Sequence, residues 1–417
     1  MSDVSKFLIP AGFRFAAGKA GLKKSGRADL ALIVADEGTA AAAMYTGNRV
    51  QAAPLQVDQE HMEATGGKVR TVVINAGNAN CAAGQAGLDA ARAVCRAAAQ
   101  EFGCEAEEVF PSSTGIIGVP LPAEKVNAAL PGIAKDLGAE SDHLLQLAQA
   151  ILTTDLVEKT AFARLTVKDV TGVEHEVRIA GVGKGSGMIH PQLTGPHATM
   201  LMYLMTDAEM APKAMQRMLA RVVEVSFNRI SVDGDTSTND TVLLLASGKS
   251  GVRILDSGEE SDREFEAALT QVATSLAKQV VADGEGVGHV VELRVNGAVS
   301  DQDAVRVAKA IAHSPLVKTA WAGKDPNWGR LVAAIGYSGA EIDPGKIDIS
   351  FGELPICRDG GRAPGLDEQA AHAYLSQPEF SITIELHQDL REGTGSCVFW
   401  TTDLTAEYVR INADYSS

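Results

Sequence analysis

Residues 71–118 decide the fold of this chain: TVVINAGNANCAAGQAGLDAARAVCRAAAQEFGCEAEEVFPSSTGIIG. Residues 72–74 form a short apolar run that predicts a buried strand. Residues 82–102 place apolar side chains at helical spacing, and a second strand follows and ends in the turn at 112–118. A strand, helix, strand alternation of this kind indicates an α/β protein.

The alternation continues along the chain in both directions. Residues 29–74 read as strands, residues 123–152 as helical, and residues 160–182 as a hairpin. The remaining predictions are strands at 200–208, 241–248, 290–295, 381–388, 396–404 and 408–415, and helices at 210–227, 262–282 and 302–313. Neither an internal repeat nor a linker marks a boundary between the two halves.

Composition excludes several classes of protein. The 417 residues contain 37 Lys and Arg against 53 Asp and Glu, a net charge of −16, which argues against a nucleic-acid binder. Hydrophobic residues make up 45% and charged residues 22%, so there is ample apolar material for a large core. The five cysteines contain no CxxC pair, which predicts reduced thiols in a cytosolic protein and implies no metal site.

The sequence also predicts no membrane attachment. The first residues lack the charged region and the apolar stretch of a signal peptide. No apolar run approaches the ~18 residues that a membrane-spanning helix needs. We therefore expect a soluble, cytoplasmic protein.

Several suggestive motifs fail on inspection. Residues 248–250, GKS, lack the glycine of a phosphate-binding loop, because Leu243 stands in its place. Ser186 has no glycine two positions away on either side, so it is not in a nucleophile elbow. The acidic loop 233–240 has neither the sixth-position glycine nor the closing glutamate of a calcium loop.

A set of small, polar segments remains that ordinary core packing does not need. They are NAGNAN at 75–80, SSTGIIG at 112–118, TTD at 153–155, GKGSGMIHPQLTGPHATML at 183–201, DGDTSTND at 233–240, ADGEG at 282–286, KDPNWGR at 324–330 and INADYSS at 411–417. Together they resemble the ornithine acetyltransferase (glutamate N-acetyltransferase) family of arginine biosynthesis, over nearly the whole chain.

The resemblance implies a fold and a maturation step. Members of that family have mixed β-sheets layered against helices and are of the self-cleaving N-terminal-nucleophile type. The matching bond here is Ala198–Thr199, so we expect an alpha chain, 1–198, and a beta chain, 199–417, interwoven rather than independent. The two chains are expected to remain associated as a heterotetramer with two copies of each.

Cleavage would turn Thr199 into a nucleophile. A threonine hydroxyl needs a base, and a free α-amino group with a reference pKa of ~7.7–8.0 on the same residue supplies one. By itself Thr199 reads as a β-branched residue opening a strand, so only the surrounding motif favours catalysis.

Other site residues follow from the resemblance. Thr114 and Gly115 match the family's oxyanion site, although residues 112–118 alone read equally well as a tight turn. The expected substrate-binding residues are Thr153 or Thr154, between which the spacing does not decide, Lys184, Thr199, Glu285, Asn412 and Ser417. Lys184 suits a substrate carboxylate and Glu285 an α-amino group.

Two departures from the family pattern stand out. Residues 193–196 look inserted before the scissile bond, which bears on the rate of self-cleavage. Gly288 and His289 stand where the family commonly has Thr and Lys, which bears on substrate preference.

The implied reaction is transfer of acetyl from N2-acetylornithine to glutamate through an acetyl-Thr199 intermediate, with ping-pong kinetics and without metal or organic cofactor. Use of acetyl-CoA as a co-substrate stays open, since no separate motif for it is visible. The alternatives are an N-terminal-nucleophile amidase or aminopeptidase, in which water takes the acyl group, and a non-catalytic protein that retains the fold.

Overall fold

The computed structural model describes residues 7–168, 173–193, 196–197, 200–387 and 395–414. These residues form two compact units. Unit 1 holds residues up to 228 together with 236–280, and unit 2 holds 229–235 together with the described residues from 281 onward. Unit 1 therefore includes strands from both sides of residue 198, and the boundary between the units differs from that of the expected chains 1–198 and 199–417.

Unit 1 contains a four-stranded sheet in the order β1-β2-β4-β5. Its strands are β1 (Phe13–Gly18), β2 (Leu30–Ala35), β4 (Thr71–Asn78) and β5 (Val109–Ile116). The last two are parallel, and α2 (Gly84–Phe102) connects them. The strand, helix, strand unit expected over residues 71–118 is confirmed.

A second, six-stranded sheet in unit 1 has the order β6-β7-β9-β12-β3-β8. Its strands are β3 (Ala40–Thr46), β6 (Lys159–Lys168), β7 (Glu174–Lys184), β8 (Pro196–His197), β9 (Leu201–Thr206) and β12 (Thr241–Ala246). The expected hairpin is the antiparallel pair of β6 and β7. The turn expected at 170–172 lies outside the described residues. A small pair, β10 (Glu209–Met210) with β13 (Arg253–Ile254), also lies in this unit.

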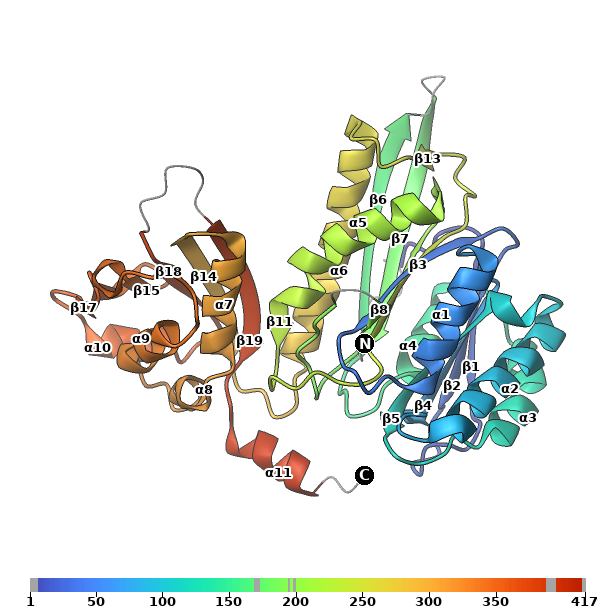
Figure 1. Ribbon diagram of the computed structural model, residues 1–417, viewed down its shortest axis with the longest axis horizontal. Helices are drawn as coiled ribbons and strands as arrows, with labels where there is room; N and C mark the ends of the chain where they lie inside the picture. The colour runs from blue at the N-terminus through green and yellow to red at the C-terminus, as the bar shows by residue number, and fades with distance from the viewer. Residues whose placement is uncertain (1–6, 169–172, 194–195, 198–199, 388–394, 415–417) are drawn as a thin grey trace. The chain divides into compact units, whose positions relative to one another are not determined.

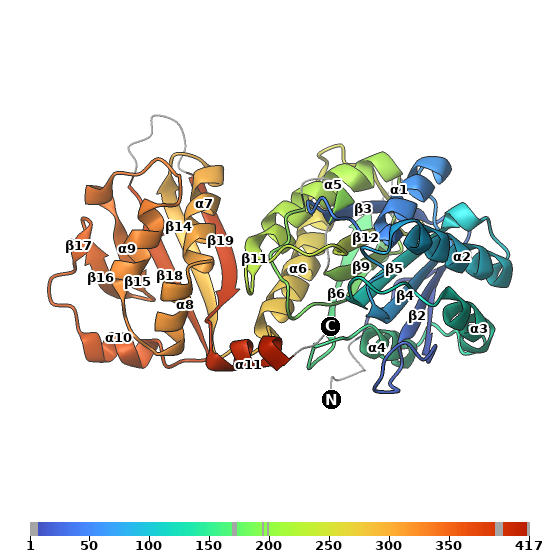
Figure 2. The ribbon, with the colours of Figure 1, turned by 60° about the horizontal axis from the view of Figure 1, so that its bottom comes forward.

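The two sheets of unit 1 enclose one apolar core. Phe15 and Ile74 of the four-stranded sheet and Tyr203 and Leu243 of the six-stranded sheet are fully buried in it. Helices α2 and α3 (Ala123–Ala134) cover the outer face of the four-stranded sheet (Figure 2). Helices α5 (Pro212–Val225) and α6 (Glu260–Ala282) pack on the six-stranded sheet (Figure 1). The expected mixed α/β architecture, with sheets layered against helices, is confirmed.

One sequence expectation in unit 1 is wrong. Residues 53–65 form a helix, α1 (Ala53–Thr65), inside the stretch expected to be strands. Two of its buried positions are polar, Asp58 and His61, so hydropathy does not reveal its inner face. Its ends carry local signals, a proline in the first turn and Gly66 in the left-handed conformation after the last.

The stretch expected to be helical, 123–152, contains two helices, α3 and α4 (Ser141–Ala150). Between them Gly138 makes an antiparallel bridge to Phe15 of β1, with N–H to O distances of 2.8 and 3.0 Å. This bridge takes the chain out of the helical path. It also places α4 on the core side of the sheet, where Leu144 and Leu147 are buried.

Unit 2 is built on a seven-stranded sheet in the order β11-β19-β14-β18-β15-β16-β17. Its strands are β11 (Ile230–Ser231), β14 (Val290–Ala298), β15 (Asp348–Phe351), β16 (Leu354–Arg358), β17 (Gly361–Arg362), β18 (Glu379–Glu385) and β19 (Gly395–Thr402). Its helices are α7 (Asp301–Ala312), α8 (Pro315–Ala322), α9 (Trp328–Gly336), α10 (Glu368–Tyr374) and α11 (Ala406–Asp414). Side chains of α7, α8, α9 and α10 join the strands in one apolar core.

The strand expected at 408–415 is wrong, because the described part of this segment belongs to α11. Thr405 accepts the backbone N–H of Tyr408 at 3.3 Å, as an N-terminal cap does. Arg410 pairs with Glu407 one turn earlier at 2.5 Å. The apolar alternation in the sequence does not indicate a core face, since no residue of α11 is buried.

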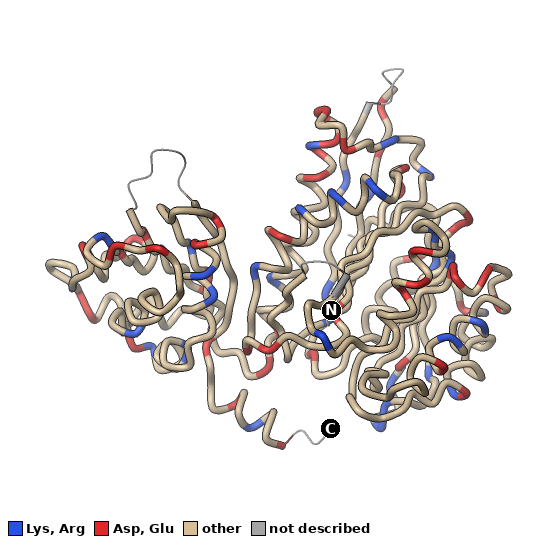
Figure 3. The backbone as a smooth tube through the Cα atoms, viewed as in Figure 1, with Lys and Arg blue, Asp and Glu red and all other residues tan. Residues whose placement is uncertain are grey.

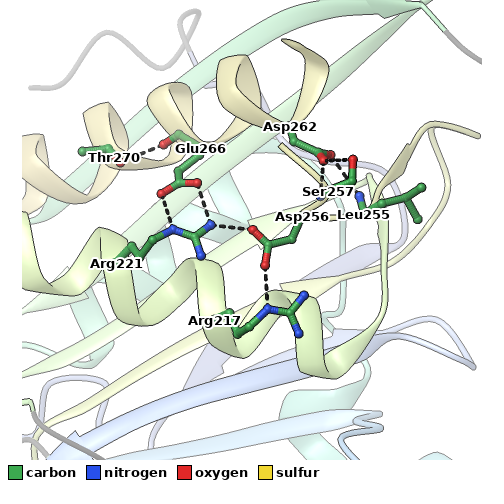
Figure 4. A network of polar contacts seen from close by, with 8 residues as sticks. All are labelled: Arg217, Arg221, Leu255, Asp256, Ser257, Asp262, Glu266 and Thr270. Atoms are coloured by element: carbon green, nitrogen blue, oxygen red, sulfur yellow. Dashed lines mark hydrogen bonds and ion pairs between the residues drawn. The ribbon is translucent and has the colours of Figure 1, made fainter. Parts of the chain in front are cut away.

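Charge lies mainly outside the sheets of unit 1. Strands β2, β3, β9 and β12 contain no charged residue (Figure 3). On the outer helices, Arg221 of α5 binds Glu266 of α6 through two nitrogens at 2.8 and 2.7 Å and Asp256 at 2.5 Å (Figure 4). Hydrogen bonds to Glu266 and Asp256 raise the pKa of Arg221. In the described part of the chain, no helix is both long and apolar enough to cross a bilayer.

Candidate active site

The turn expected over residues 112–118 is wrong for most of its length, because residues up to Ile116 belong to β5, which ends beside the end of β4. Gly115 has a φ of +132° and pairs with Gly77 of β4. A Cβ on Gly115 would lie 2.4 Å from the carbonyl carbon of Gly77, so only glycine fits here. Thr114, the preceding residue, is buried at 4% exposure. The backbones of β4 and β5 are therefore in contact at Gly77 and Gly115, beside the buried hydroxyl of Thr114.

A network of amides holds the ends of these two strands. Ser113 donates its hydroxyl to Asn75 at 2.6 Å, and Asn75 donates to the carbonyl of Asn78 at 2.8 Å. Asn239 donates to the carbonyls of Ala79 and Ser113 at 2.5 and 2.9 Å. The structure thus brings together three of the polar segments that carry the resemblance, at 75–80, 112–118 and 233–240.

Lys184 reaches Thr114 from the end of β7. Its Nζ donates to Thr114 Oγ1 at 3.4 Å, and the side chain is largely buried. The backbone of Lys184 pairs with Leu201, the first residue of β9. Thr114, Gly115 and Lys184, which the sequence places in the site from distant segments, are therefore neighbours in unit 1.

Asp155 connects these parts and is absent from the predicted site residues. Its Oδ1 accepts from Lys159 Nζ at 2.9 Å and from the backbone N–H of Gly185 at 2.7 Å. Its Oδ2 accepts the N–H of Thr153 at 3.0 Å and lies 3.7 Å from Lys184 Nζ. One carboxylate thus fixes the 153–155 turn, the start of β6 and the end of β7.

The electrostatics of this cluster favour an ionised Asp155. Burial opposes ionisation, but Lys184 and Lys159, with the hydrogen bonds from Lys159 and Thr153, hold the pKa of Asp155 well below its usual range. Asp155 and Lys159 both have side chains at 0% exposure. The spacing Asp155, Lys159 was a sequence signal, although it does not distinguish a surface pair from a buried one.

Of the two candidate threonines, Thr153 is tied to this cluster. Its hydroxyl donates to Asp155 Oδ2 at 3.5 Å, in addition to its backbone N–H. Thr154 is half-buried beside it. Which of the two contacts substrate stays a prediction.

Ala198, Thr199 and Ser417 lie outside the described residues. The chain that follows the expected cleavage bond is described from Met200, which is fully buried and whose carbonyl accepts the N–H of Thr241 at 2.5 Å. Leu201 then opens β9 between Lys184 of β7 and Thr241 of β12.

Glu285 and Asn412 belong to unit 2 and bind each other there. Asn412 Nδ2 donates to Glu285 Oε2 at 2.9 Å. The loop that carries Glu285 lies against the start of α11, since Thr405 donates its hydroxyl to the carbonyl of Gly286 at 2.6 Å. Gly286 has a φ of +65°, and a Cβ there would lie 2.3 Å from the backbone nitrogen of Tyr408. The structure thus pairs two predicted residues that are far apart in the sequence.

The unusual residues Gly288 and His289 both bind Asp403. Asp403 accepts the N–H of Gly288 at 2.9 Å, and its other oxygen lies 2.7 Å from His289 Nδ1. A Cβ on Gly288 would lie 2.7 Å from that carboxylate, so the glycine makes room for it. These contacts support a structural role for His289, while its effect on substrate preference stays untested.

Within the described ranges, no group of three or more His, Cys, Asp or Glu side chains is arranged to hold a metal ion. No disulfide joins the five cysteines, which are all described. Thr114, Lys184 and the backbone at Gly115 can donate hydrogen bonds and stabilise negative charge.

Comparison with known proteins identifies close relatives. The family described as the ArgJ family matches residues 14–417. The arginine biosynthesis bifunctional protein ArgJ of Geobacter sulfurreducens is 44% identical over 404 residues, which are 97% of this chain and 98% of that protein. The crystal structure of the argJ bifunctional protein of Bacillus halodurans has 42% identity and a TM-score of 0.48, and covers 50% of this chain and 96% of that one. The Mycobacterium tuberculosis ornithine acetyltransferase, solved with ornithine, has 33% identity and a TM-score of 0.39, and covers 44% of this chain and 94% of that one.

Proposed function

The chain belongs to the ArgJ family, and we propose that it transfers the acetyl group of N2-acetylornithine to glutamate, giving ornithine and N-acetylglutamate in arginine biosynthesis. It is an acyltransferase of arginine biosynthesis. The family match supports this assignment over almost the full length of the chain, 14–417. Its substrates are therefore small molecules, and in this proposal they are amino acids.

The proposed nucleophile is Thr199, freed by self-cleavage of the Ala198–Thr199 bond. Its Oγ attacks the acetyl carbonyl carbon of acetylornithine while its own α-amino group takes the hydroxyl proton. The carbon–nitrogen bond then breaks, the amine of ornithine receives a proton, and an acetyl ester remains on Thr199. The α-amine of glutamate attacks the carbonyl carbon of this ester, the bond between that carbon and the threonine oxygen breaks, and a proton of the attacking amine passes to the threonine oxygen.

The described cluster supplies the other requirements of the reaction. A tetrahedral intermediate carries an oxyanion, and Thr114 with the backbone at Gly115 is proposed to stabilise it. Each donor in such a site contributes roughly 2.7–4 kcal/mol. Lys184 is proposed to bind a substrate carboxylate, with Thr153 or Thr154 as a further substrate-binding residue. By the resemblance, Glu285 is proposed to bind the α-amino group, and Asn412 and Ser417 are proposed as further substrate-binding residues.

One observation carries the mechanism more than any other. The buried hydroxyl of Thr114 lies 3.4 Å from Lys184 Nζ, next to a glycine whose φ of +132° no other residue could adopt without strain. A buried lysine beside this glycine suits an anionic substrate that reacts there.

Intact-mass spectrometry combined with kinetics tests this proposal. The wild-type protein should give two chains of 198 and 219 residues, and initial velocities against both substrates should give parallel lines. Thr199→Ala should remain one chain and lose transfer, whereas the matched Thr199→Ser should keep both properties in part. An uncut active protein, or intersecting lines, would disprove the covalent mechanism.

The same assays separate the alternatives. Free acetate as the product would identify an N-terminal-nucleophile amidase or aminopeptidase instead. Formation of acetylglutamate from acetyl-CoA and glutamate alone would add the second activity. We further propose that the enzyme works in the cytoplasm as a heterotetramer of two alpha and two beta chains, without metal or organic cofactor.

A further inference from the structure

The loop between β1 and β2 is held by a single buried carboxylate. Asp29 is 1% exposed and accepts the backbone N–H groups of Ala20, Leu22 and Lys23 at 2.6, 2.5 and 2.9 Å. A carboxylate that accepts three N–H groups fixes a loop firmly, because such charge-assisted bonds are stronger than neutral ones. The position of Lys23 is therefore determined by the fold.

The aliphatic part of Lys23 lies against Gly77, on the strand that pairs with residues 112–116. Gly77 has a φ of +106°, and a Cβ there would lie 3.3 Å from Lys23 Cγ. Gly77 is the strand partner of Gly115. The stem of Lys23 therefore lies beside Gly77, on the strand next to Thr114 and Gly115.

The ammonium group of Lys23 is oriented by two carbonyl oxygens. Its Nζ donates to Ala28 at 2.8 Å and to Ala150 at 2.7 Å. Ala150 ends α4, and the turn that carries Thr153 and Asp155 follows it. An ammonium group has three protons, so one remains for a ligand after these two bonds.

The charges around Lys23 leave a positive excess. Among the described residues, Asp155 is engaged at short range by Lys159, at 2.9 Å, and lies farther from Lys184, at 3.7 Å. No ion pair to Lys23 occurs within the same ranges. Burial first, then repulsion by Arg27 and Lys184, lowers the pKa of Lys23 to about 8, against the attraction of Asp29 and Asp155. Around Lys23, the basic side chains Lys23, Arg27, Lys159 and Lys184 outnumber the two carboxylates, Asp29 and Asp155.

We propose that Lys23 is a substrate-binding residue that, together with Lys184, receives the two carboxylates of the glutamate that accepts the acetyl group. This inference rests on the proposed function and names a further residue for it. Acetylornithine carries one carboxylate and a side-chain ammonium group, whereas glutamate carries two carboxylates. Lys23 therefore selects for the dicarboxylic acceptor rather than for the acetyl donor.

The two half-reactions separate this role from a structural one. Lys23→Met should raise KM for glutamate about tenfold or more, the effect of one charge-assisted hydrogen bond, and change acetyl-enzyme formation from acetylornithine less than threefold. Lys23→Arg should restore most of the loss, and Lys24→Met, at an exposed neighbouring lysine, should have no effect. Equal effects on both half-reactions, or no effect on glutamate, would overturn the inference.

The pH dependence gives an independent readout. In the wild type, KM for glutamate should rise as Lys23 loses its proton above pH 8, and in Lys23→Arg this rise should be absent, since arginine stays charged. The groups that face Lys23 are Arg27, Asp29, Asp155 and Lys184, and these are the same in both proteins. Identical pH profiles would overturn the inference, even if Lys23→Met failed to fold.

An assay for acetylglutamate, combined with calorimetric titration with glutamate, separates the proposed function from the role proposed for Lys23. If the wild type makes no acetylglutamate, the proposed function fails. If it does, but Lys23→Met binds glutamate as tightly as the wild type, only the role of Lys23 fails.

Discussion

Replacing Asp155 by asparagine should lower the free energy of unfolding of this protein by about 3–5 kcal/mol, the usual cost of breaking a buried ion pair. Asp155 and Lys159 both have fully buried side chains 2.9 Å apart, so the variant leaves the lysine charge buried without its partner. The asparagine retains one acceptor oxygen, but it cannot hold both Lys159 and the N–H groups of Thr153 and Gly185 as the carboxylate does.

The pH dependence of stability follows from the same residue. Because the folded-state pKa of Asp155 is below its unfolded value of about 3.9, its stabilisation is fully present above that value and is lost as pH falls toward the folded pKa. As the pH is lowered from about 5, the free energy of unfolding of the wild type should therefore fall more than that of Asp155→Asn. The two unfolding curves should converge as the medium becomes more acidic.

Urea unfolding followed by circular dichroism measures both effects. Asp142→Asn is the matched control, because Asp142 is exposed. The double variant Asp155→Leu with Lys159→Met should recover much of the loss, since an apolar pair often replaces a buried ion pair at little cost. A loss below about 1 kcal/mol for Asp155→Asn, the range of an exposed pair, would refute the reasoning.

Three further predictions concern other parts of the molecule. Gly115→Ala should reduce kcat of acetyl transfer by about a hundredfold or more, because its Cβ would collide with the neighbouring strand at 2.4 Å; a steady-state assay checks this. Arg221→Met should lower the free energy of unfolding by about 1 kcal/mol, because the Arg221 side chain binds both Asp256 and Glu266 but is partly exposed. The loss should be smaller in high salt, and thermal unfolding at two salt concentrations checks this. Lys318 is buried in unit 2, and desolvation lowers its pKa to about 8. Above that pH the folded state binds fewer protons than the unfolded state, so the free energy of unfolding should rise with pH between about 8 and 10.4. Lys318→Met should remove this rise, and unfolding titrations at several pH values check it.

The sequence named Thr114, Gly115 and Lys184 from distant segments, and the structure shows that they are neighbours, while their roles stay predictions. The sequence predicted that Gly115 lets the backbone approach a substrate from a turn; the structure places Gly115 inside β5, where its backbone closely approaches Gly77 of β4. The importance of Asp155 was not predictable, because the sequence shows only that a lysine follows four residues later. Its burial and its contact with Gly185 depend on the pairing of β6 with β7.

The amino-acid sequence alone determined the α/β class, the strand, helix, strand unit and the family, because short-range hydropathy patterns and long polar motifs are local properties of the chain. Only the tertiary structure decided that residues 53–65 and 406–414 are helices and that Thr114, Asp155 and Lys184 meet. Those outcomes depend on burial and on contacts between segments far apart in the sequence, which local propensity does not encode.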